Sequence, residues 1–401
     1  MHHVGALGGP GEAQLTGNGE EVFDLAQFHI YTIDGTYEKE SLDKMTPSGS
    51  DEHMPVVTRI SRRNFARLAT VAAGALTVTA CGPAHRDAPT APSGTGGPPA
   101  APRHSLGPVQ QIDAGALSVG YVDAGPADGQ PVILLHGWPY DIHSYADVTA
   151  ALAGQGFRVI VPFARGFGST RFRSADTVRN AQQSALAHDV IDLMDALNIP
   201  NAILGGYDWG GRTANVVAAL WPQRVRGLVA VSGYIIVNLE ANLAPLPPTA
   251  EYGWWYQYYF ATPRGELGYR QNTKDFNRLI WQNASPLWHF ADSTYDLSAA
   301  AFDNPDHVAI VIHNYRWRQS LAPGEARYDA DERRLAAKPP ITVPTITIGS
   351  DFDGPAKDGA GYRVRYTGRY VHRVLDGIGH NVPQEAPDQF AAAINDVHRM
   401  G

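Results

Sequence analysis

The stretch Gly205-Gly206-Tyr207-Asp208-Trp209-Gly210-Gly211-Arg212 decides the fold of this chain. The apolar segment Ala202-Ile203-Leu204 precedes it and predicts a buried strand, and residues 213–221 after it have the composition of a helix that ends at a proline. A strand, a glycine-flanked residue and a helix form the context of a nucleophile elbow, the G-x-S-x-G pattern, here with Asp208 in the serine position. A glycine lies two residues either side of Asp208, where so sharp a turn leaves least room for side chains.

The elbow places Asp208 at the N-terminus of a helix, where the macrodipole favours an ionised carboxylate. A simpler interpretation is a tight turn between strand and helix in a doubly wound protein, with Asp208 as an ordinary helix cap. The stretch alone does not separate the two, and the rest of the chain has to decide between them.

Composition limits the possible classes of protein. At 401 residues the chain has room for one large α/β domain with an insertion or a tail. A net charge of -8 offers no basic footprint for nucleic acid. Cys81 is the single cysteine, so no intrachain disulfide and no cysteine-based metal site can form.

The N-terminal part reads as targeting sequence rather than as part of a folded domain. Residues 1–53 lack an amphipathic period and are expected to be disordered or to lie upstream of the true start, which we place at Met54 or Met45. Within residues 54–81 a basic segment is followed by a short apolar run that is too short to span a bilayer but suits a signal peptide. Residues 82–105 are a linker rich in Pro, Gly and Ala that would act as a tether.

Two motifs in this segment resemble known export signals. Ser61-Arg62-Arg63-Asn64-Phe65 resembles a twin-arginine signal, and Val78-Thr79-Ala80-Cys81 resembles a bacterial lipobox. The resemblance implies export by the twin-arginine pathway and lipidation of Cys81, with the protein anchored at the outer face of the cell membrane or in the periplasm. The alternative is a short basic amphipathic helix with a buried cysteine.

From residue 106 onward, strands alternate with helical segments, which predicts an α/β fold with a mostly parallel sheet flanked by helices. The first two strands alternate like a hairpin. The expected strands are Gln110–Asp113, Leu117–Val122, Pro131–Leu135, Phe157–Val161, Ala202–Leu204, Gly227–Val231, Ile341–Ile348 and Tyr370–Leu375. The expected helices, besides the one after Asp208, are 144–153, 180–197 and 387–397.

The alternation stops between residues 234 and 338, a segment dense in tryptophan and tyrosine that has helix signals but no buried-strand runs. We expect it to form a helical cap inserted into the core and placed over the carboxyl ends of the strands, where such sheets bind ligands. The core itself would then consist of residues 106–233 and 339–401.

From Leu106 to Gly401 the chain resembles the α/β-hydrolase fold, in the branch of epoxide hydrolases and haloalkane dehalogenases. The resemblance is carried by His136-Gly137-Trp138-Pro139, by the elbow around Asp208, by Asp353 after a late strand and by His380 before the last helix. Their order along the chain, nucleophile, acid and histidine, is also that of the family.

The resemblance implies a mechanism with a covalent intermediate. Asp208 would attack a carbon of the substrate and form an ester, and His380 would activate the water that hydrolyses it. Asp353 would orient His380, and the backbone N–H groups of Trp138 and Trp209 would form the oxyanion hole. The chemistry calls for no metal and no organic cofactor, since the second substrate is water.

The acid of the proposed triad has two candidates. Asp353 is preferred because its spacing to Gly354 matches the acid loop of the family better, while Asp351 stays as the alternative. His380 as a surface or capping histidine is the simpler interpretation of that residue, and its Gly-x-Gly-His setting argues against it.

The leaving group decides the activity within this branch. An epoxide needs a proton donor, and Tyr256 and Tyr315 lie in segments similar to the two tyrosine motifs of epoxide hydrolases, although both could be packing aromatics. A halide needs only N–H donors such as Trp209, but Trp138 stands where haloalkane dehalogenases commonly have asparagine. Arg212 is shared with fluoroacetate-type dehalogenases, which typically carry arginine at the position of Trp209.

Three functions follow. The first is an epoxide hydrolase that forms a vicinal diol, with a small apolar epoxide and water as substrates, because the cap is aromatic. The second is a haloalkane or haloacid dehalogenase using the same Asp208, Asp353 and His380. The third is a non-catalytic ligand-binding lipoprotein, because a fold does not fix a function. The oligomeric state is not predicted.

Overall fold

The computed structural model describes residues 104–401. The predicted signal, Cys81 and nearly all of the predicted linker lie outside the described residues. In the described part, nine strands form one sheet in the order β1-β2-β4-β3-β6-β7-β8-β9, with β5 paired to β2. The strands are β1 (Gln110–Ala114), β2 (Leu117–Ala124), β3 (Pro131–Leu135), β4 (Arg158–Pro162), β5 (Arg171–Phe172), β6 (Ala202–Gly206), β7 (Val225–Val231), β8 (Thr345–Ser350) and β9 (Tyr370–Leu375).

In this order, all strand pairs from β4 to β9 are parallel. The hairpin β1–β2 joins the sheet because β2 pairs with β4 in antiparallel orientation. Both the predicted hairpin and the mostly parallel sheet are confirmed. Because the carboxyl ends of parallel strands meet at one edge, the loops after β3, β6, β8 and β9 come together there. Four of the predicted site residues follow these strands, namely Trp138, Asp208, Asp353 and His380.

Alternation along the central strands places side chains in two apolar clusters, as expected for a sheet buried on both faces. Ile203 and Val229 belong to one cluster, and the adjacent Leu204 and Leu228 belong to the other. The continuous apolar runs in the sequence therefore reflect burial on both faces.

Helices cover both faces of this sheet. α3 packs against α4, and α13 packs against α2 and β7. The helices outside the layer described next are α2 (Ala146–Gly154), α3 (Gln183–Ala196), α4 (Asp208–Leu220), α11 (Asp329–Ala336), α12 (Val382–Glu385) and α13 (Pro387–Met400). Of these, α11 lies in the range predicted as cap but packs on α4. Short 3-10 helices in the described part are η1 (Ile142–Tyr145), η2 (Pro222–Arg224), η3 (Ala241–Leu243), η4 (Ala300–Asp303), η5 (Ala326–Tyr328), η6 (Asp351–Asp358) and η7 (Arg363–Arg365).

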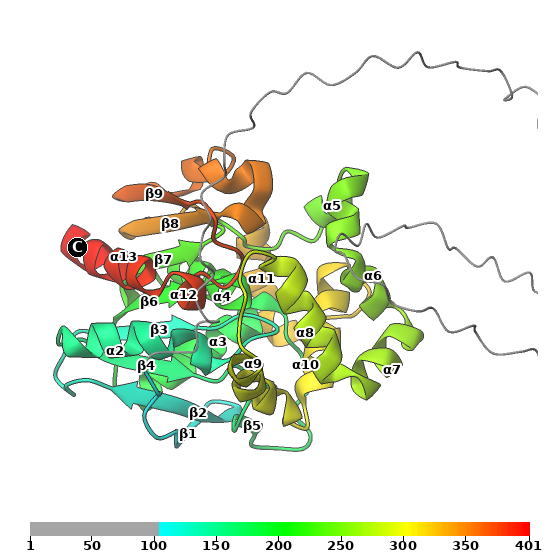
Figure 1. Cartoon of the computed structure of the whole chain (residues 1–401), viewed down its shortest axis with the longest axis horizontal. Coiled ribbons are helices and arrows are strands. Elements are labelled where there is room, and N and C mark those ends of the chain that lie inside the picture. The colour runs from blue at the N-terminus through cyan, green and yellow to red at the C-terminus, as the bar shows by residue number, and fades with distance from the viewer. Residues whose placement is uncertain (1–103) are drawn as a thin grey trace, which may run out of the picture. The chain divides into compact units, whose positions relative to one another are not determined.

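Between β7 and α11 along the chain, six further helices gather on one side of the sheet (Figure 1). They are α5 (Pro248–Gly253), α6 (Trp255–Ala261), α7 (Pro263–Gln271), α8 (Thr273–Ala284), α9 (Asp292–Ala299) and α10 (His307–Arg318). Two indoles tie this helical layer to the loop after β3. Trp281 donates its Nε1–H to the Pro139 carbonyl at 2.8 Å, and Trp138 donates its own to the Tyr269 hydroxyl at 3.0 Å.

One predicted strand is shorter than expected. β8 begins at Thr345, directly after Pro344, and not at Ile341. Proline lacks the N–H that a ladder needs, so the chain joins the sheet only after it. Ile341 forms instead an isolated bridge with Tyr366. The helix of the elbow, α4, begins at Asp208, which agrees with the predicted position of Asp208 at the N-terminus of a helix.

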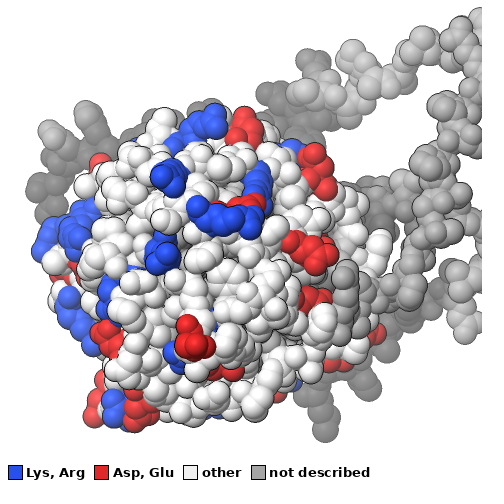
Figure 2. Space-filling view, turned by 90° about the vertical axis from the view of Figure 1, so that its left-hand side faces the viewer, with Lys and Arg blue, Asp and Glu red and all other residues white. Residues whose placement is uncertain are grey.

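The face drawn in Figure 2 shows acidic and basic side chains interspersed among uncharged ones, so that neither sign forms a continuous field on it. Residues 104–401 include no helix that is both long enough and apolar enough to cross a membrane.

Candidate active site

Asp208 lies at the junction of β6 and α4 in a left-handed backbone conformation, with φ of 50°. The neighbouring glycines make this turn possible. A Cβ on Gly210 would lie 1.9 Å from the carbonyl oxygen of Leu135, and a Cβ on Gly206 would lie 2.5 Å from the carbonyl carbon of Gly210. Both contacts are to backbone, which cannot move aside. The structure therefore has the strained turn that exposes an elbow residue at the end of a strand.

The two carboxylate oxygens of Asp208 have different partners. Oδ1 accepts the backbone N–H of Trp138 at 2.7 Å, and Oδ2 lies 3.5 Å from Nε2 of His380. Burial alone would raise the pKa of Asp208, but the bond to His380, the charges of His380 and Arg212 and the Trp138 N–H together lower it below its usual value. Asp208 is thus held ionised in a largely buried position, as a nucleophile requires.

The backbone around His380 is fixed by a small polar cluster. Its N–H donates to the hydroxyl of Ser285 at 2.9 Å, and this hydroxyl donates to Glu385 at 2.6 Å. Glu385 also accepts the N–H groups of Gly379 at 2.7 Å and Asn381 at 2.9 Å. Neither Ser285 nor Glu385 was predicted from the sequence. A carboxylate four residues after Asn381 was a local signal for Glu385, but the contact with Ser285 comes from a distant helix.

The structure does not bring Asp353 to His380. Its carboxylate accepts the N–H of Ser350 at 2.9 Å, and the ring of Phe352 packs on the imidazole with centroids 4.0 Å apart. Among residues 104–401, Nδ1 of His380 is buried and has no hydrogen-bond partner. The role of Asp353 as the orienting acid therefore stays a prediction.

Asp351, the alternative acid, does not contact His380 either. Its carboxylate accepts from the Lys357 ammonium at 3.0 Å and from the Gly377 N–H at 2.8 Å, and it lies at the protein surface. The pKa of Asp351 is lowered chiefly by the bond with Lys357, as in an ordinary surface ion pair. Its partners give it a structural role at the end of β8.

The two predicted cap tyrosines meet next to Asp208. Tyr256 on α6 and Tyr315 on α10 are both buried, and their rings pack edge to face with centroids 5.3 Å apart. Each ring also packs on Trp138, at 5.2 Å and 5.1 Å. Burial raises the pKa of both hydroxyls, and the charge of Asp208 raises each further. Both phenols are therefore protonated at neutral pH and can donate hydrogen bonds.

Trp209 contributes two N–H groups to this site. Its backbone N–H belongs to the first turn of α4, where such groups have no acceptor within the helix. Its indole Nε1 is buried and has no hydrogen-bond partner in the described part of the chain. The indole packs against Tyr315 with centroids 5.9 Å apart.

A chain of hydrogen bonds that was not predicted from the sequence holds the side chain of Trp138. Its indole N–H donates to the Tyr269 hydroxyl, which lies 2.8 Å from Nε2 of His307. Burial lowers the pKa of His307 to about 4, although the bond to the Gly166 carbonyl opposes this change. The neutral imidazole donates from Nδ1 to Gly166 at 2.9 Å, so that Nε2 accepts from Tyr269. This chain fixes the residue whose backbone N–H holds Asp208.

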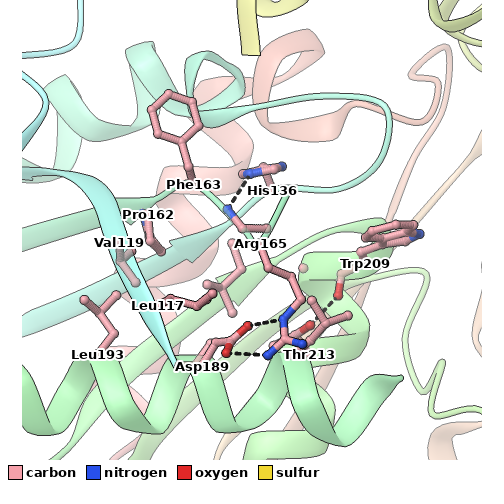
Figure 3. A pocket seen from close by; sticks show the side chains of 15 residues that line it. Leu117, Val119, His136, Pro162, Phe163, Arg165, Asp189, Leu193, Trp209 and Thr213 are labelled. Carbon is pink, nitrogen blue, oxygen red and sulfur yellow. Dashed lines mark hydrogen bonds and ion pairs between the residues drawn. The ribbon is translucent and has the colours of Figure 1, made fainter. Parts of the chain in front are cut away.

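A separate cavity lies behind the elbow, between the sheet and helices α3 and α4 (Figure 3). It is mostly apolar, with a buried ion pair between Arg165 and Asp189 at 2.6 Å on one wall. His136 and Trp209 line it, whereas Asp208 and His380 do not. It is therefore not the place where the elbow chemistry occurs. Within residues 104–401, no three His, Cys, Asp or Glu side chains gather as metal ligands.

Comparison with known proteins agrees with this geometry. A family model described as the alpha/beta hydrolase fold matches residues 130–299. A crystal structure from Klebsiella pneumoniae, named as a candidate epoxide hydrolase, is 61% identical with a TM-score of 0.71, and the match covers 73% of this chain and 97% of that one.

Two curated relatives point to the same branch. A haloalkane dehalogenase of Mycolicibacterium paratuberculosis is 30% identical over 52% of this chain and 69% of its own length. An epoxide hydrolase of Caballeronia sordidicola is 25% identical over 68% of this chain and 87% of its own length. The predicted fold class and the prediction of an enzyme are confirmed. The chain belongs to the α/β-hydrolase family, as an enzyme with epoxide hydrolases and haloalkane dehalogenases among its homologues.

Proposed function

We propose that this hydrolase opens an epoxide to a vicinal diol through an ester formed on Asp208. The observation that carries the proposal is the environment of that carboxylate. It has an N–H donor on one oxygen, a histidine facing the other, and two buried, protonated tyrosines whose pKa values respond to its charge. A nucleophile, a base and proton donors are the groups that epoxide hydrolysis needs.

In the first step, Oδ2 of Asp208 attacks one ring carbon and the bond from that carbon to the epoxide oxygen breaks. The oxygen leaves with the electron pair and takes a proton from the hydroxyl of Tyr256 or Tyr315. Oδ1 stays in the hydrogen bond with Trp138 and becomes the carbonyl oxygen of the ester. Two phenols bind an alkoxide more strongly than a neutral epoxide oxygen. They therefore stabilise the transition state of ring opening more than the bound substrate.

In the second step, Nε2 of His380 takes a proton from water, and the hydroxide attacks Cγ of Asp208. The negative charge develops on Oδ1, where the backbone N–H groups of Trp138 and Trp209 stabilise it. Collapse breaks the bond between Cγ and the alkyl-bearing oxygen, and the diol leaves with the oxygen that Asp208 contributed. His380 returns its proton to the departing oxygen of the diol, and the proton left on the new carboxyl group of Asp208 reprotonates the tyrosinate.

A single turnover in water labelled with oxygen-18 tests this proposal, with enzyme in excess over an aryl epoxide such as styrene oxide. The diol of the first turnover should be unlabelled, and the label should appear in the peptide that contains Asp208. Label in the diol of the first turnover would show that water attacks the epoxide directly, and would refute the covalent route.

A dehalogenase is the second candidate, and one observation favours it. The buried indole N–H of Trp209 has no acceptor within 3.5 Å among residues 104–401 and lies close to the Tyr315 hydroxyl, and such a donor can stabilise a departing halide. The same Asp208 ester and the same His380-activated water would then complete the reaction. Release of bromide from bromoalkanes in a multiple-turnover assay, compared with diol formation from epoxides, separates the two activities.

We also propose that the protein is exported and anchored through Cys81, on the support of the paired arginines and the lipobox-like residues described above. Metabolic labelling with palmitate should mark the full-length protein and should fail to mark a Cys81→Ala variant. Equal labelling of both would refute the anchor.

A further inference from the structure

Arg212 brings a positive charge into the site that the proposed steps do not use. It follows Asp208 by four residues on α4, so both side chains leave the same side of the helix. The residue is only 6% exposed, and its Nε donates to the Ile235 carbonyl at 3.1 Å. Its Nη1 is buried and has no hydrogen-bond partner among residues 104–401.

A second guanidinium comes from the other side of the site. Arg318 is the last residue of α10, and its carbon Cζ lies 5.5 Å from the centre of the Tyr315 ring. Its Nε is also buried without a partner in the described part. Arg316, two residues earlier, forms an ion pair with Glu266 at 2.9 Å. Arg318, in contrast, has no carboxylate oxygen of residues 104–401 within 4.0 Å.

The two cations are close enough to act on each other. Burial, and then the charge of Arg318, lower the pKa of Arg212 to about 10, while Asp208 and the two tyrosines act in the opposite direction. Arg212 is therefore charged at neutral pH. A buried guanidinium with an unpaired N–H is costly unless a ligand satisfies it.

The proposed reaction moves the negative charge that faces these cations but does not add to it. Asp208 becomes neutral when it forms the ester, while the tyrosine that protonates the epoxide oxygen becomes a tyrosinate. The two cations therefore face a single negative charge in both steps. An anion that arrives with the substrate and stays until the diol leaves would balance them throughout both steps.

We propose that Arg212 and Arg318 bind a carboxylate of the substrate, so that the substrate class is that of epoxy acids with the carboxylate close to the ring. This inference rests on the proposed function and deepens it. Two unpaired N–H groups on two guanidiniums match the two oxygens of a carboxylate. The substrate is then not wholly apolar, in contrast to what the aromatic cap suggested. The aromatic rings of the cap would contact its carbon skeleton, and the two guanidiniums would bind its carboxylate.

The test compares 3-phenylglycidate with 3-phenylglycidamide, which have nearly the same size and differ in charge. The kcat/KM of the acid should exceed that of the amide at neutral pH. Arg318→Met should reduce this preference at least about tenfold, because it removes a charged partner while keeping the aliphatic stem. Arg270→Met is the matched control, because Arg270 is an exposed cap arginine paired with Glu266, and it should leave the preference unchanged.

A binding measurement keeps the inference testable apart from catalysis. Calorimetry on Asp208→Asn should show 3-phenylpropanoate binding more tightly than 3-phenylpropanamide, with the difference lost in the double variant with Arg318→Met. An unchanged acid preference in Arg318→Met, or equal binding of acid and amide, would overturn the anion site. If epoxides fail to alkylate Asp208 while the carboxylate still binds through Arg318, the proposed function fails and the anion site stands.

Discussion

The oxygens of Asp208 show how one residue can serve both steps of a reaction. Oδ1 already lies in the hydrogen bond that would later stabilise an oxyanion, and Oδ2 lies on the side of His380. The lowered pKa of Asp208 favours its ionised, reactive form at neutral pH. What distinguishes an epoxide from a halide at this site is the proton donor.

We predict that Tyr256→Phe and Tyr315→Phe each slow the alkylation of Asp208 by an epoxide at least about tenfold, because a departing alkoxide loses a donor. Alkylation by a bromoalkane should be affected less, since bromide needs no proton. Rapid-quench mass measurements of the adduct would give both rates. Equal slowing with both substrates would show that the tyrosines only pack.

The preference for anionic substrates should depend on pH. The pKa of Arg212 lies at about 10, so its positive charge is present below that pH and is lost as the pH rises through it. The groups that face it are Asp208, Arg318, Tyr256 and Tyr315. We predict that the acid-to-amide ratio of kcat/KM falls between pH 9 and pH 10.5. A ratio that stays constant over this range would show that the charge of Arg212 does not contribute to binding of the acid substrate.

The acid of the triad can be identified by paired substitutions. We predict that Asp353→Asn lowers the rate of ester hydrolysis about 10²- to 10⁴-fold, because the role predicted for Asp353 is to orient His380. Asp351→Asn should have a small effect, since Asp351 is a surface partner of Lys357. Single-turnover rates of diol release measure both. The reverse order of effects would transfer the role to Asp351.

At the level of elements, the elbow depends on the close approach of α4 to the end of β3. A methyl group on Gly210 would meet the Leu135 carbonyl, whereas a methyl group on Gly154, at the end of α2, would meet nothing within 4 Å. We predict that Gly210→Ala lowers the free energy of unfolding by about 1–3 kcal/mol. Gly154→Ala should be neutral or slightly stabilising. Urea unfolding curves test this, and equal midpoints for the two variants would contradict it.

The longer strands and their order along the chain were predictable because their signal is local, whereas the two-residue strand β5 was not predicted. Apolar runs marked the buried strands, and glycines marked the elbow at Asp208. The start of β8 was missed because the apolar run continues through Pro344, although proline interrupts the ladder. Periodicity shows which residues are buried, but the hydrogen-bonding capacity of the backbone decides where a strand begins.

At the level of the whole molecule, the sequence revealed single residues of the site but not their distant partners. The tyrosine motifs located Tyr256 and Tyr315, yet nothing local paired Trp138 with Tyr269, or Arg212 with Arg318. These pairs join segments that are more than a hundred residues apart. The aromatic density of the cap therefore suggested an apolar substrate, and the charges emerged only when the cap was packed on the core.

In the proposed mechanism, Asp208 becomes covalently attached to the substrate. Intact mass measurement of a His380→Ala variant can detect this attachment, because the variant should form the ester but should not hydrolyse it. After incubation with styrene oxide, or separately with a bromoalkane, the protein should gain the whole mass of the epoxide, and this gain should be absent in Asp208→Asn. A gain only from the bromoalkane would assign the protein to dehalogenation. No gain from either class, in a variant that still folds, would contradict the account.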